Sequence, residues 1–244
     1  MAVQFENVSK TFGDLKVLND VSLSVSEGEA LCILGRSGTG KSVTLKLMIG
    51  LLKPDSGKVS IGGEDIVPLG EKELSGVRRK MGFLFQSAAL FDSFTVGENL
   101  SLPLHRFDKT KSPSDIQQAV AEALRSVGLE KDQNKMPSEL SGGMQKRAGL
   151  ARAMILSPRL LLVDEPSSGL DRITASEIDD LLLKVKTELR TTLVIVTHDV
   201  YEARRIADKA VVLDQGQLAG FGTMDELSNS ENQLVRRLTS EVEQ

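Results

Sequence analysis

The chain has 244 residues, so it can hold one large domain with a sizeable core. Its net charge of −4 gives no support for nucleic-acid binding or for broad attraction to anionic lipid. One cysteine excludes an internal disulfide, no apolar run approaches the roughly 20 residues that cross a bilayer, and the first residues do not resemble a signal peptide.

Short stretches of alternating polar and apolar residues open the chain. They predict antiparallel strands at 3–8, 15–18 and 21–25, joined by turns such as Phe12-Gly13-Asp14. Five short, nearly continuous apolar runs follow, as expected for strands buried on both faces of a parallel sheet. These runs are Ala30–Leu34, Met81–Phe85, Leu160–Val163, Leu193–Val196 and Ala210–Leu213. Helical segments between several of them predict an α/β core.

From residue 86 to about residue 158 the pattern changes, and helical signals replace buried strands. Ser114-Asp115 is expected to cap a helix that runs through Val127 and is closed by Gly128. The polar segment 106–113 is expected to be a loop. This region therefore predicts a mostly helical lobe inserted into the core.

The last part of the chain shows two further signals. Gln215-Gly216 predicts a tight hairpin, and the polar tail is expected to be helical. We interpret the chain as one domain, with a nucleotide-binding core at 1–86 and 159–225. The helical lobe then spans 87–158 and the tail spans 226–244.

The segment from Gly35 to Ser42 fits the phosphate-binding loop G-x-x-x-x-G-K-[ST] at every fixed position. It lies between a predicted strand and a predicted helix at 43–52, the setting that the motif needs and a plain glycine-rich turn does not. Such a loop aims backbone N–H groups and a helix dipole at a polyphosphate. Lys41 is expected to reach the β- and γ-phosphates, and the Ser42 hydroxyl to bind Mg²⁺. The nucleotide-binding residues expected here are Gly35, Ser37, Gly38, Thr39, Gly40, Lys41, Ser42 and Thr44.

A second candidate motif lies far downstream, where an apolar strand ends in Asp164 and Glu165. A strand of this kind brings Asp164 beside the phosphate loop, where it can hold Mg²⁺ directly or through water. Glu165 would then accept a proton from the attacking water. Acidic residues also end ordinary strands, so this motif indicates a nucleotide site only in combination with the phosphate loop.

Residues 140–147 read Leu-Ser-Gly-Gly-Met-Gln-Lys-Arg. Ser141 is expected to cap a helix, and Gly142 and Gly143 leave its first N–H groups open for an anion. The segment resembles the signature motif of ATP-binding-cassette (ABC) ATPases. Its Ser141 lies 23 residues before Asp164, a spacing that this family shows.

Other motifs of the same family can be matched in chain order. Gln86 resembles the Q-loop glutamine, Ser168-Gly169-Leu170-Asp171 the D-loop, and His198 the switch histidine. Phe12 resembles the aromatic residue that stacks on adenine, although tyrosine is commoner there. The resemblance covers essentially the whole chain. It implies a P-loop NTPase (RecA-like) core with an N-terminal antiparallel β subdomain and an inserted helical lobe.

The resemblance also implies cofactors and an assembly. ATP and Mg²⁺ would be held by one chain, while Ser141-Gly142-Gly143 would face a nucleotide bound to a second copy, in a head-to-tail dimer around two ATP molecules. His198 would bond the γ-phosphate, and Gln86 would contact Mg²⁺ and the attacking water. With Glu165 these two residues form the expected catalytic set, and Asp171 is expected near the nucleotide.

Without a membrane segment of its own, a transporter ATPase of this family needs separate integral-membrane permease chains. The segment 83–100 resembles the zone that receives a short permease helix, and Phe91 and Phe94 are candidate contacts, with core packing as the alternative. The implied location is cytoplasmic, on the inner face of the cell membrane. No nucleic acid is expected as a partner.

Finer resemblance narrows the class of transporter. Val43 and Leu90-Phe91-Asp92 resemble the ATPase subunits of MCE-type systems, which move phospholipid or sterol-like lipids with an MCE-domain protein. Two alternatives stay open. One is the ATPase of a small-solute importer, for example for amino acids, and the other is a non-transport cassette of the cell-division type.

Overall fold

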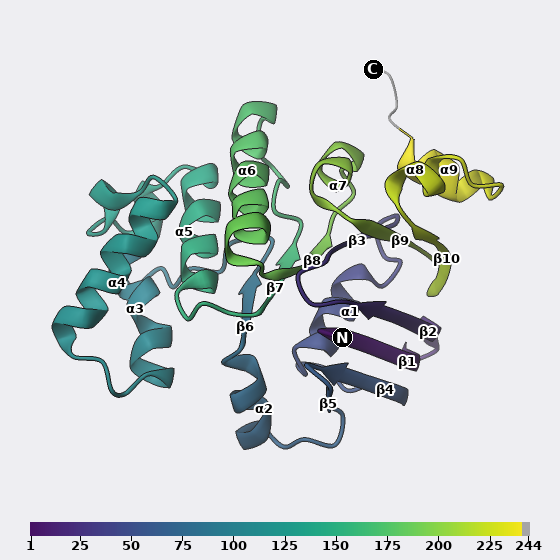
Figure 1. Cartoon of the computed structure of the whole chain (residues 1–244), viewed down its shortest axis with the longest axis horizontal. Helices are drawn as coiled ribbons and strands as arrows, with labels where there is room; N and C mark the ends of the chain where they lie inside the picture. Colours follow the sequence, from purple (N-terminus) through teal and green to yellow (C-terminus); the bar gives the residue numbers. More distant parts are fainter. Residues whose placement is uncertain (241–244) are drawn as a thin grey trace.

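The computed structural model describes residues 1–240, in two β-sheets with helices around them (Figure 1). The smaller sheet is antiparallel and has the strand order β2-β1-β4-β5. Its strands are β1 (Val3–Phe12), β2 (Leu15–Val25), β4 (Ser56–Ile61) and β5 (Glu64–Asp65). The predicted N-terminal antiparallel region is confirmed by this sheet.

One detail of that prediction is wrong, because 15–18 and 21–25 are parts of the single strand β2. Between them Asp20 has a φ of 56°, and the pairing with β1 shifts register across this point. The local irregularity interrupts the alternation of polar and apolar residues without ending the strand. The predicted turn is present, and Gly13 supplies its positive φ of 56°.

The larger sheet has the strand order β10-β9-β3-β8-β7-β6. All five predicted buried strands lie in it, parallel to one another, and β10 pairs antiparallel with β9. The bounds are β3 (Ala30–Leu34), β6 (Met81–Leu84), β7 (Leu160–Asp164), β8 (Thr192–Val196), β9 (Lys209–Asp214) and β10 (Gln217–Gly222). Their apolar residues are buried on both faces, which explains why the sequence runs do not alternate.

Two apolar clusters cover the two faces of the large sheet. One fills the space between the sheets, together with α1 (Lys41–Met48) and α2 (Glu71–Arg78). The other packs a second group of helices on the opposite face, as seen above the sheet in Figure 1. These helices are α6 (Arg172–Leu189), α7 (Val200–Ile206), α8 (Met224–Ser228) and α9 (Gln233–Thr239).

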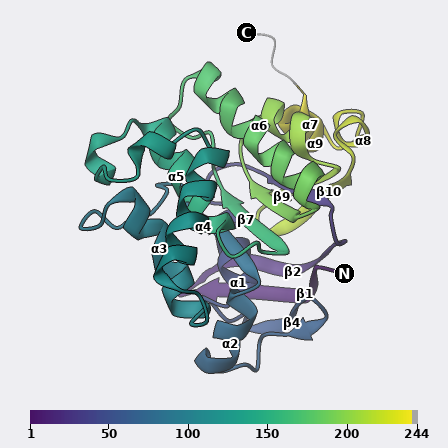
Figure 2. The same ribbon diagram turned by 60° about the vertical axis from the view of Figure 1, so that its left-hand side comes forward.

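A third apolar cluster belongs to a group of helices beside the sheets, which comes forward in Figure 2. Its helices are α3 (Val96–Phe107), α4 (Pro113–Ser126) and α5 (Gly142–Met154), with short 3₁₀ turns at Glu130–Asp132 and Pro137–Glu139. No strand occurs between 86 and 158, which are all described residues. The separate cluster supports our proposed lobe at 87–158.

The predicted N-cap of the helix at 114–127 is wrong by two residues. Ser112, and not Ser114, caps α4: its hydroxyl accepts from the Asp115 N–H at 3.2 Å, while the Asp115 carboxylate accepts the Ser112 N–H at 3.0 Å. This reciprocal capping box lets Pro113 occupy the first helical position, where no N–H is needed. Helix α4 ends at Ser126, and Gly128 follows with a φ of 71°.

The loop predicted at 106–113 is also too long. Helix α3 continues to Phe107 in spite of the internal Pro103, and a capping box between Thr95 and Glu98 starts it. Only residues 108–112 remain between α3 and α4. Similarly, the helix expected at 43–52 ends at Met48, followed by Gly50 with a φ of 66°.

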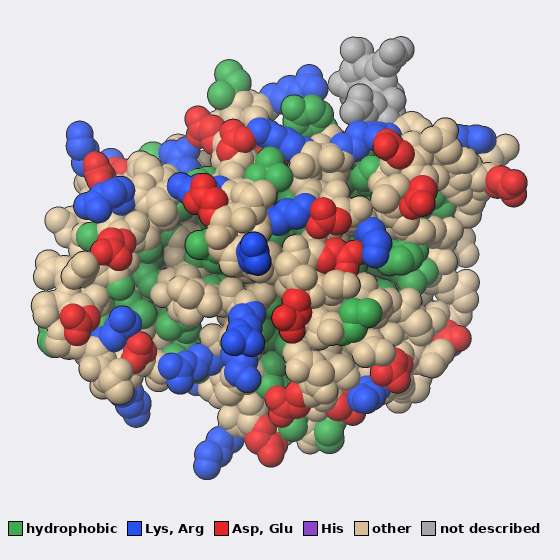
Figure 3. Space-filling view, in the orientation of Figure 1, with side chains coloured by type: hydrophobic (Ala, Val, Ile, Leu, Met, Phe, Trp, Pro, Cys, Tyr) green, Lys and Arg blue, Asp and Glu red, His purple; other side chains and the backbone are tan. Residues whose placement is uncertain are grey.

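The C-terminal predictions are confirmed where the structure describes them. Gln215 and Gly216 both have positive φ, at 46° and 76°, as a tight hairpin between β9 and β10 requires. The tail forms α8 and α9, and its last four residues lie outside the described part. Among residues 1–240, no helix is both long enough and apolar enough to span a membrane. Acidic and basic side chains are interspersed on the face shown in Figure 3.

Candidate active site

The candidate residues meet at one edge of the large sheet. Strands β3, β8 and β7 are neighbours and parallel, so their carboxyl ends lie side by side. Gly35 follows β3, His198 lies just beyond β8, and Asp164 ends β7. Strand β6, whose end leads to Gln86, lies next to β7. This edge is the place where open α/β sheets bind ligands.

The phosphate-binding loop depends on glycines because the backbone is crowded there. Gly35, Gly38 and Gly40 have φ values of 155°, 82° and 102°. A Cβ on Gly35 would lie 2.5 Å from the Leu213 carbonyl oxygen, and one on Gly40 would lie 2.9 Å from the Val17 carbonyl oxygen. These contacts press the loop against β9 and β2, and only glycine fits.

Side chains of this loop differ in their exposure. The Lys41 ammonium is largely buried and donates to the Gly35 and Arg36 carbonyl oxygens at 2.7 and 3.1 Å. Burial lowers the pKa of Lys41, while the charges of Glu165 and Asp164 act in the opposite direction.

The other predicted loop residues divide into two groups. Ser37 and Gly38 are exposed. The Thr39 hydroxyl donates to the Arg36 carbonyl oxygen at 2.8 Å, and the fully buried Thr44 hydroxyl donates to the Gly40 carbonyl oxygen at 3.1 Å. Thr39 and Thr44 therefore stabilise the loop and the first turn of α1.

A possible cation site is formed where α1 begins and β7 ends. The Ser42 hydroxyl donates to Asp164 Oδ1 at 3.2 Å. Burial raises the pKa of Asp164, and the Ser42 hydrogen bond opposes that shift. No group of three His, Cys, Asp or Glu side chains suitable for a metal occurs among residues 1–240. A hydroxyl and one carboxylate suit Mg²⁺, which takes few protein ligands and completes its shell with phosphates and water.

Glu165 and His198 form the closest polar contact of the site. Glu165 Oε2 lies 2.6 Å from His198 Nδ1, and the Glu165 side chain is 12% exposed against 68% for His198. The Glu165 backbone has a φ of 48°, and its N–H donates to the Val196 carbonyl oxygen at 2.8 Å. This left-handed conformation turns the chain sharply after β7 and aims the carboxylate toward the residue that follows β8.

Sequence reasoning missed Lys146, which supports this turn. Its buried ammonium donates to the Glu165 carbonyl oxygen at 2.8 Å. Lys146 belongs to the segment 140–147, which was interpreted only as an anion-binding helix start. The sequence carries no local signal that distinguishes Lys146 from a lysine on the exposed face of a helix.

Gln86 lies at the same edge, and its side-chain amide donates to the Ser168 hydroxyl at 3.3 Å. Gln86 is exposed, and this contact joins the segment after β6 to the segment after β7. Sequence reasoning placed Ser168 in a motif but gave it no partner.

Residues 18–168 match the family model of the ABC transporter. The chain belongs to this family. It is the ATPase subunit of an ABC transporter, and ATP hydrolysis by such subunits is coupled to transport.

Curated relatives match over nearly the whole chain. A probable ribonucleotide transport ATP-binding protein, mkl, of Mycobacterium leprae is 42% identical, over 97% of this chain and 68% of the relative. TRIGALACTOSYLDIACYLGLYCEROL 3, a chloroplastic protein of Arabidopsis thaliana, is 38% identical, over 98% and 73%. The methionine import ATP-binding protein MetN of Caulobacter vibrioides is 37% identical, over 99% and 73%.

The dimeric ATP-binding cassette MJ0796 bound to ADP and phosphate superposes with a TM-score of 0.84 at 35% identity. The match covers 91% of this chain and 98% of MJ0796. The predicted fold is therefore confirmed, and cassettes of this family bind adenine nucleotides and form dimers.

The signature segment of this ABC ATPase lies against the start of α6. Ser141 caps α5 by accepting the Met144 N–H at 3.3 Å, and Ser141 and Gly142 are exposed. A Cβ on Gly143 would lie 2.3 Å from Thr174 Cγ2, so glycine is needed for this close packing.

The remaining two predicted site residues have local partners. The Asp171 carboxylate caps α6, accepting from the N–H groups of Ile173 and Thr174 at 3.0 Å each. Phe12 ends β1, is 45% exposed, and lies under the Lys10 ammonium, 5.5 Å from the ring centre. The same hairpin contacts the phosphate loop through Val17.

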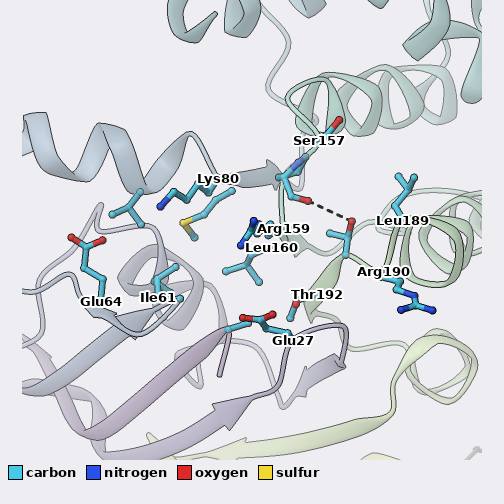
Figure 4. Close-up of a pocket in the computed structure, with 16 residues that line it drawn as sticks. Glu27, Ile61, Glu64, Lys80, Ser157, Arg159, Leu160, Leu189, Arg190 and Thr192 are labelled. Atoms are coloured by element: carbon cyan, nitrogen blue, oxygen red, sulfur yellow. Dashed lines mark hydrogen bonds between the residues drawn. The ribbon is translucent and has the colours of Figure 1, made fainter.

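A cavity of about 410 Å³ lies elsewhere in the molecule (Figure 4). It is lined by the first residues of β6, β7 and β8, namely Met81, Leu160 and Thr192. Asp164 lies at the other end of β7, so the cavity is at the opposite edge of the sheet from the candidate active site.

Proposed function

We propose that Glu165 and His198 catalyse ATP hydrolysis at this edge of the sheet. The observation that carries the proposal is their 2.6 Å contact beside the Ser42–Asp164 pair. Glu165 accepts a proton from the attacking water. The side chain of His198 is much more exposed. It contacts Glu165 through Nδ1 and donates a hydrogen bond to the γ-phosphate through its other ring nitrogen. Gln86 contacts the attacking water and links its position to the Ser168 hydroxyl.

The remaining roles follow from where each group lies. Backbone N–H groups of the loop from Gly35 to Ser42 hold the phosphates, and Lys41 leaves its loop carbonyls to pair with them. Ser42, Asp164 and Gln86 hold Mg²⁺, which when bound neutralises charge on the β- and γ-phosphates. Phe12 stacks on the adenine.

We further propose that two copies of the chain form a head-to-tail dimer. Ser141, Gly142 and Gly143 then contact the nucleotide held by the other copy, and Asp171 lies at the interface beside it. The exposure of Ser141 and Gly142 supports this role. The dimeric state of MJ0796 with bound ADP and phosphate supports it further.

The partner in the membrane is a separate permease, which places the chain on the cytoplasmic face of the cell membrane. Phe91 and Phe94 are 54% and 37% exposed, and they support a docking role better than core packing. Their rings contact each other edge to face at a centroid distance of 5.9 Å. The pair forms an apolar projection at the start of the lobe.

We propose that the transported substrate is a lipid and that the assembly includes an MCE-domain protein. Val43 and Leu90-Phe91-Asp92 support this class, as does the plant relative whose name is that of a galactolipid. Import of a small solute is the second candidate, because the methionine import protein MetN is nearly as similar. The substrate is selected by other chains, so the site chemistry is the same for both.

Affinity purification of the chain from detergent-solubilised native membranes tests the proposal. Mass spectrometry should identify a multi-span permease together with an MCE-domain protein. Phospholipid should then stimulate the ATPase activity of the purified assembly. Recovery of a solute-binding protein in place of the MCE-domain protein would establish the importer, and repeated absence of any membrane protein would refute a permease partner.

A further inference from the structure

Two acidic side chains that are not among the candidate site residues are buried between helices α6 and α7. Asp179 of α6 is 2% exposed and Glu202 of α7 is 1% exposed. Acidic residues are seldom so completely buried unless they are paired. The contacts around them therefore need an explanation.

The polar atoms of this pair are incompletely satisfied. Asp179 Oδ1 and Glu202 Oε1 are buried and find no hydrogen-bond donor among residues 1–240. Helices α6 and α7 pack against each other, and the two carboxyl groups are close enough for each to shift the pKa of the other. Two carboxylates are both acceptors and repel each other, whereas one proton between them satisfies both oxygens.

The other side of the Glu202 carboxyl faces the active site. Glu202 Oε2 accepts from the Ser167 hydroxyl at 3.4 Å, the Glu202 N–H donates to Asp199 Oδ1 at 3.2 Å, and the Thr197 side chain is close enough to lower the pKa of Glu202. Ser167 lies two residues after Glu165, and Thr197 directly precedes His198. Glu202 thus contacts both segments that carry the proposed catalytic pair.

We propose that Asp179 and Glu202 share one proton, and that this carboxyl pair positions Glu165 and His198 for hydrolysis. The inference rests on the catalytic roles proposed above. Glu202 touches no substrate and acts only through Ser167 and Thr197, so it is a positioning residue. Loss of the proton places a second negative charge between α6 and α7 and displaces both segments.

The carboxyl pair keeps its shared proton at neutral pH in spite of the charged groups around it. Burial raises the pKa of Glu202 to about 8, and burial likewise raises the pKa of Asp179 to about 6. The groups that face the pair are Asp180 on α6, Asp199 at the N-cap of α7, Arg205 on α7, Lys146 on α5 and Cys32 on β3. Arg205 lies 3.7 Å from Asp179 Oδ2 and also pairs with Asp180, so it offsets only part of the repulsion.

The sign of the pH dependence follows from these pKa values. Because the folded-state pKa of Glu202 is above its ordinary value of 4.5, the shared proton stabilises the folded chain fully below that value. The stabilisation is lost as the pH rises toward about 8. Both folding stability and catalysis should therefore decline on the alkaline side.

Glu202→Gln tests the role of the proton, because an amide can donate to Asp179 and still accept from Ser167 without titrating. Glu202→Ala removes the contacts altogether. Glu188→Gln, at an exposed position near the end of α6, is the matched control. Thermal unfolding of each full chain from about pH 5 to 9 measures the contribution of the proton to stability.

We expect the melting temperature of Glu202→Gln, relative to the wild type and the control, to rise steadily with pH. Turnover of the purified assembly at saturating ATP gives the second measurement. Glu202→Ala should lower kcat by about tenfold or more, with little change in KM, because misplaced catalytic groups slow the chemical step. Glu202→Gln should restore most of that loss and remove the additional alkaline decline of the wild type.

Parallel pH profiles of Glu202→Gln and wild type, in both stability and kcat, would overturn the shared proton. Full kcat in a folded Glu202→Ala variant would overturn the positioning role. Glu165→Gln, measured alongside, separates these outcomes from a failure of the catalytic assignment. If that variant alone retained turnover, the proposed roles of Glu165 and His198 would be at fault.

Discussion

The active-site edge and the helical lobe are held in place in different ways. At the edge, Gly35, Asp164 and His198 lie at or just beyond the carboxyl ends of three neighbouring parallel strands. The register of these strands fixes the spacing between the three residues. The lobe has its own apolar cluster, and its helix α5 also packs on the sheet through apolar residues such as Leu150, which shares a cluster with Leu84 of β6. Within the lobe, Arg152 of α5 donates to the Ala88 and Ala89 carbonyl oxygens at 2.9 and 2.8 Å, and so holds the segment after β6 against α5.

This difference indicates where a partner can influence catalysis. The strand ends are buried in two apolar clusters and leave little room for adjustment. Lys146 of the lobe bonds the Glu165 carbonyl oxygen, and Gln86, the last core residue before the lobe, bonds the Ser168 hydroxyl. A force applied to the lobe therefore reaches the catalytic residues through a few hydrogen bonds, which can shift without unfolding the core.

We expect the largest effect from a substitution that removes a catalytic group at the edge and leaves the lobe unchanged. Glu165→Gln keeps the size of the side chain but removes the proton acceptor, so kcat should fall by about 10²–10⁴-fold. ATP binding should persist, because the phosphate loop is unchanged. Turnover of the purified assembly and equilibrium binding of ATP measure the two quantities separately.

A fall in affinity of the same size as the fall in turnover would point instead to a distorted site. Retention of near-normal hydrolysis would show that Glu165 is not the proton acceptor. The melting temperature of the variant serves as the control for folding.

An intermediate effect is expected where the lobe begins. Asn99 is fully buried, and its amide donates to the carbonyl oxygens of Phe91, Phe94 and Thr95 at 3.0–3.1 Å. Asn99→Ala removes these three hydrogen bonds and also the one that the Phe91 N–H donates to Asn99 Oδ1 at 2.7 Å, so the free energy of unfolding should fall by about 1–3 kcal/mol. Asn134→Ala, at an exposed position of the same lobe, is the control.

Denaturant unfolding of both variants measures this difference. An equal effect of the two substitutions would show that the Asn99 network does not stabilise the turn at 91–95. We expect intrinsic ATP binding to survive in Asn99→Ala, because none of its contacts belongs to the phosphate loop.

The same contrast between the edge and the lobe explains which parts of the fold could be predicted from the sequence. At the edge, the motif residues are contiguous and local rules determine their conformation, so the five parallel strands and the Gln215-Gly216 hairpin could be predicted. In the lobe the N-cap of α4 was misplaced, because Ser112 and Ser114 are equally plausible until the Asp115 carboxylate is seen to bond Ser112. The polar residues from 106 onward suggested a loop, but α3 continues to Phe107 because its apolar residues pack in the lobe cluster.

The pair Asp179–Glu202 was beyond sequence reasoning for a different reason. Both residues lie on amphipathic helices where an acidic side chain is ordinarily solvated, and only the packing of α6 on α7 buries them together. Long-range burial of this kind leaves no local signal. The contact between Lys146 and Glu165 is of the same type, since it joins α5 to the end of β7.

The smallest effect on the chain itself is expected at the outer surface of the lobe. Phe91 and Phe94 contact each other but are substantially exposed, so replacing both with serine should change the free energy of unfolding by only about 0.5–1.5 kcal/mol. Binding to the permease should weaken much more, by roughly tenfold or more, because a buried aromatic anchor in an interface contributes over 1 kcal/mol. Leu51→Ser, at another exposed apolar side chain outside the lobe, controls for general loss of surface hydrophobicity. Equal recovery of the permease with the double variant and with the control would show that Phe91 and Phe94 are not part of the docking surface.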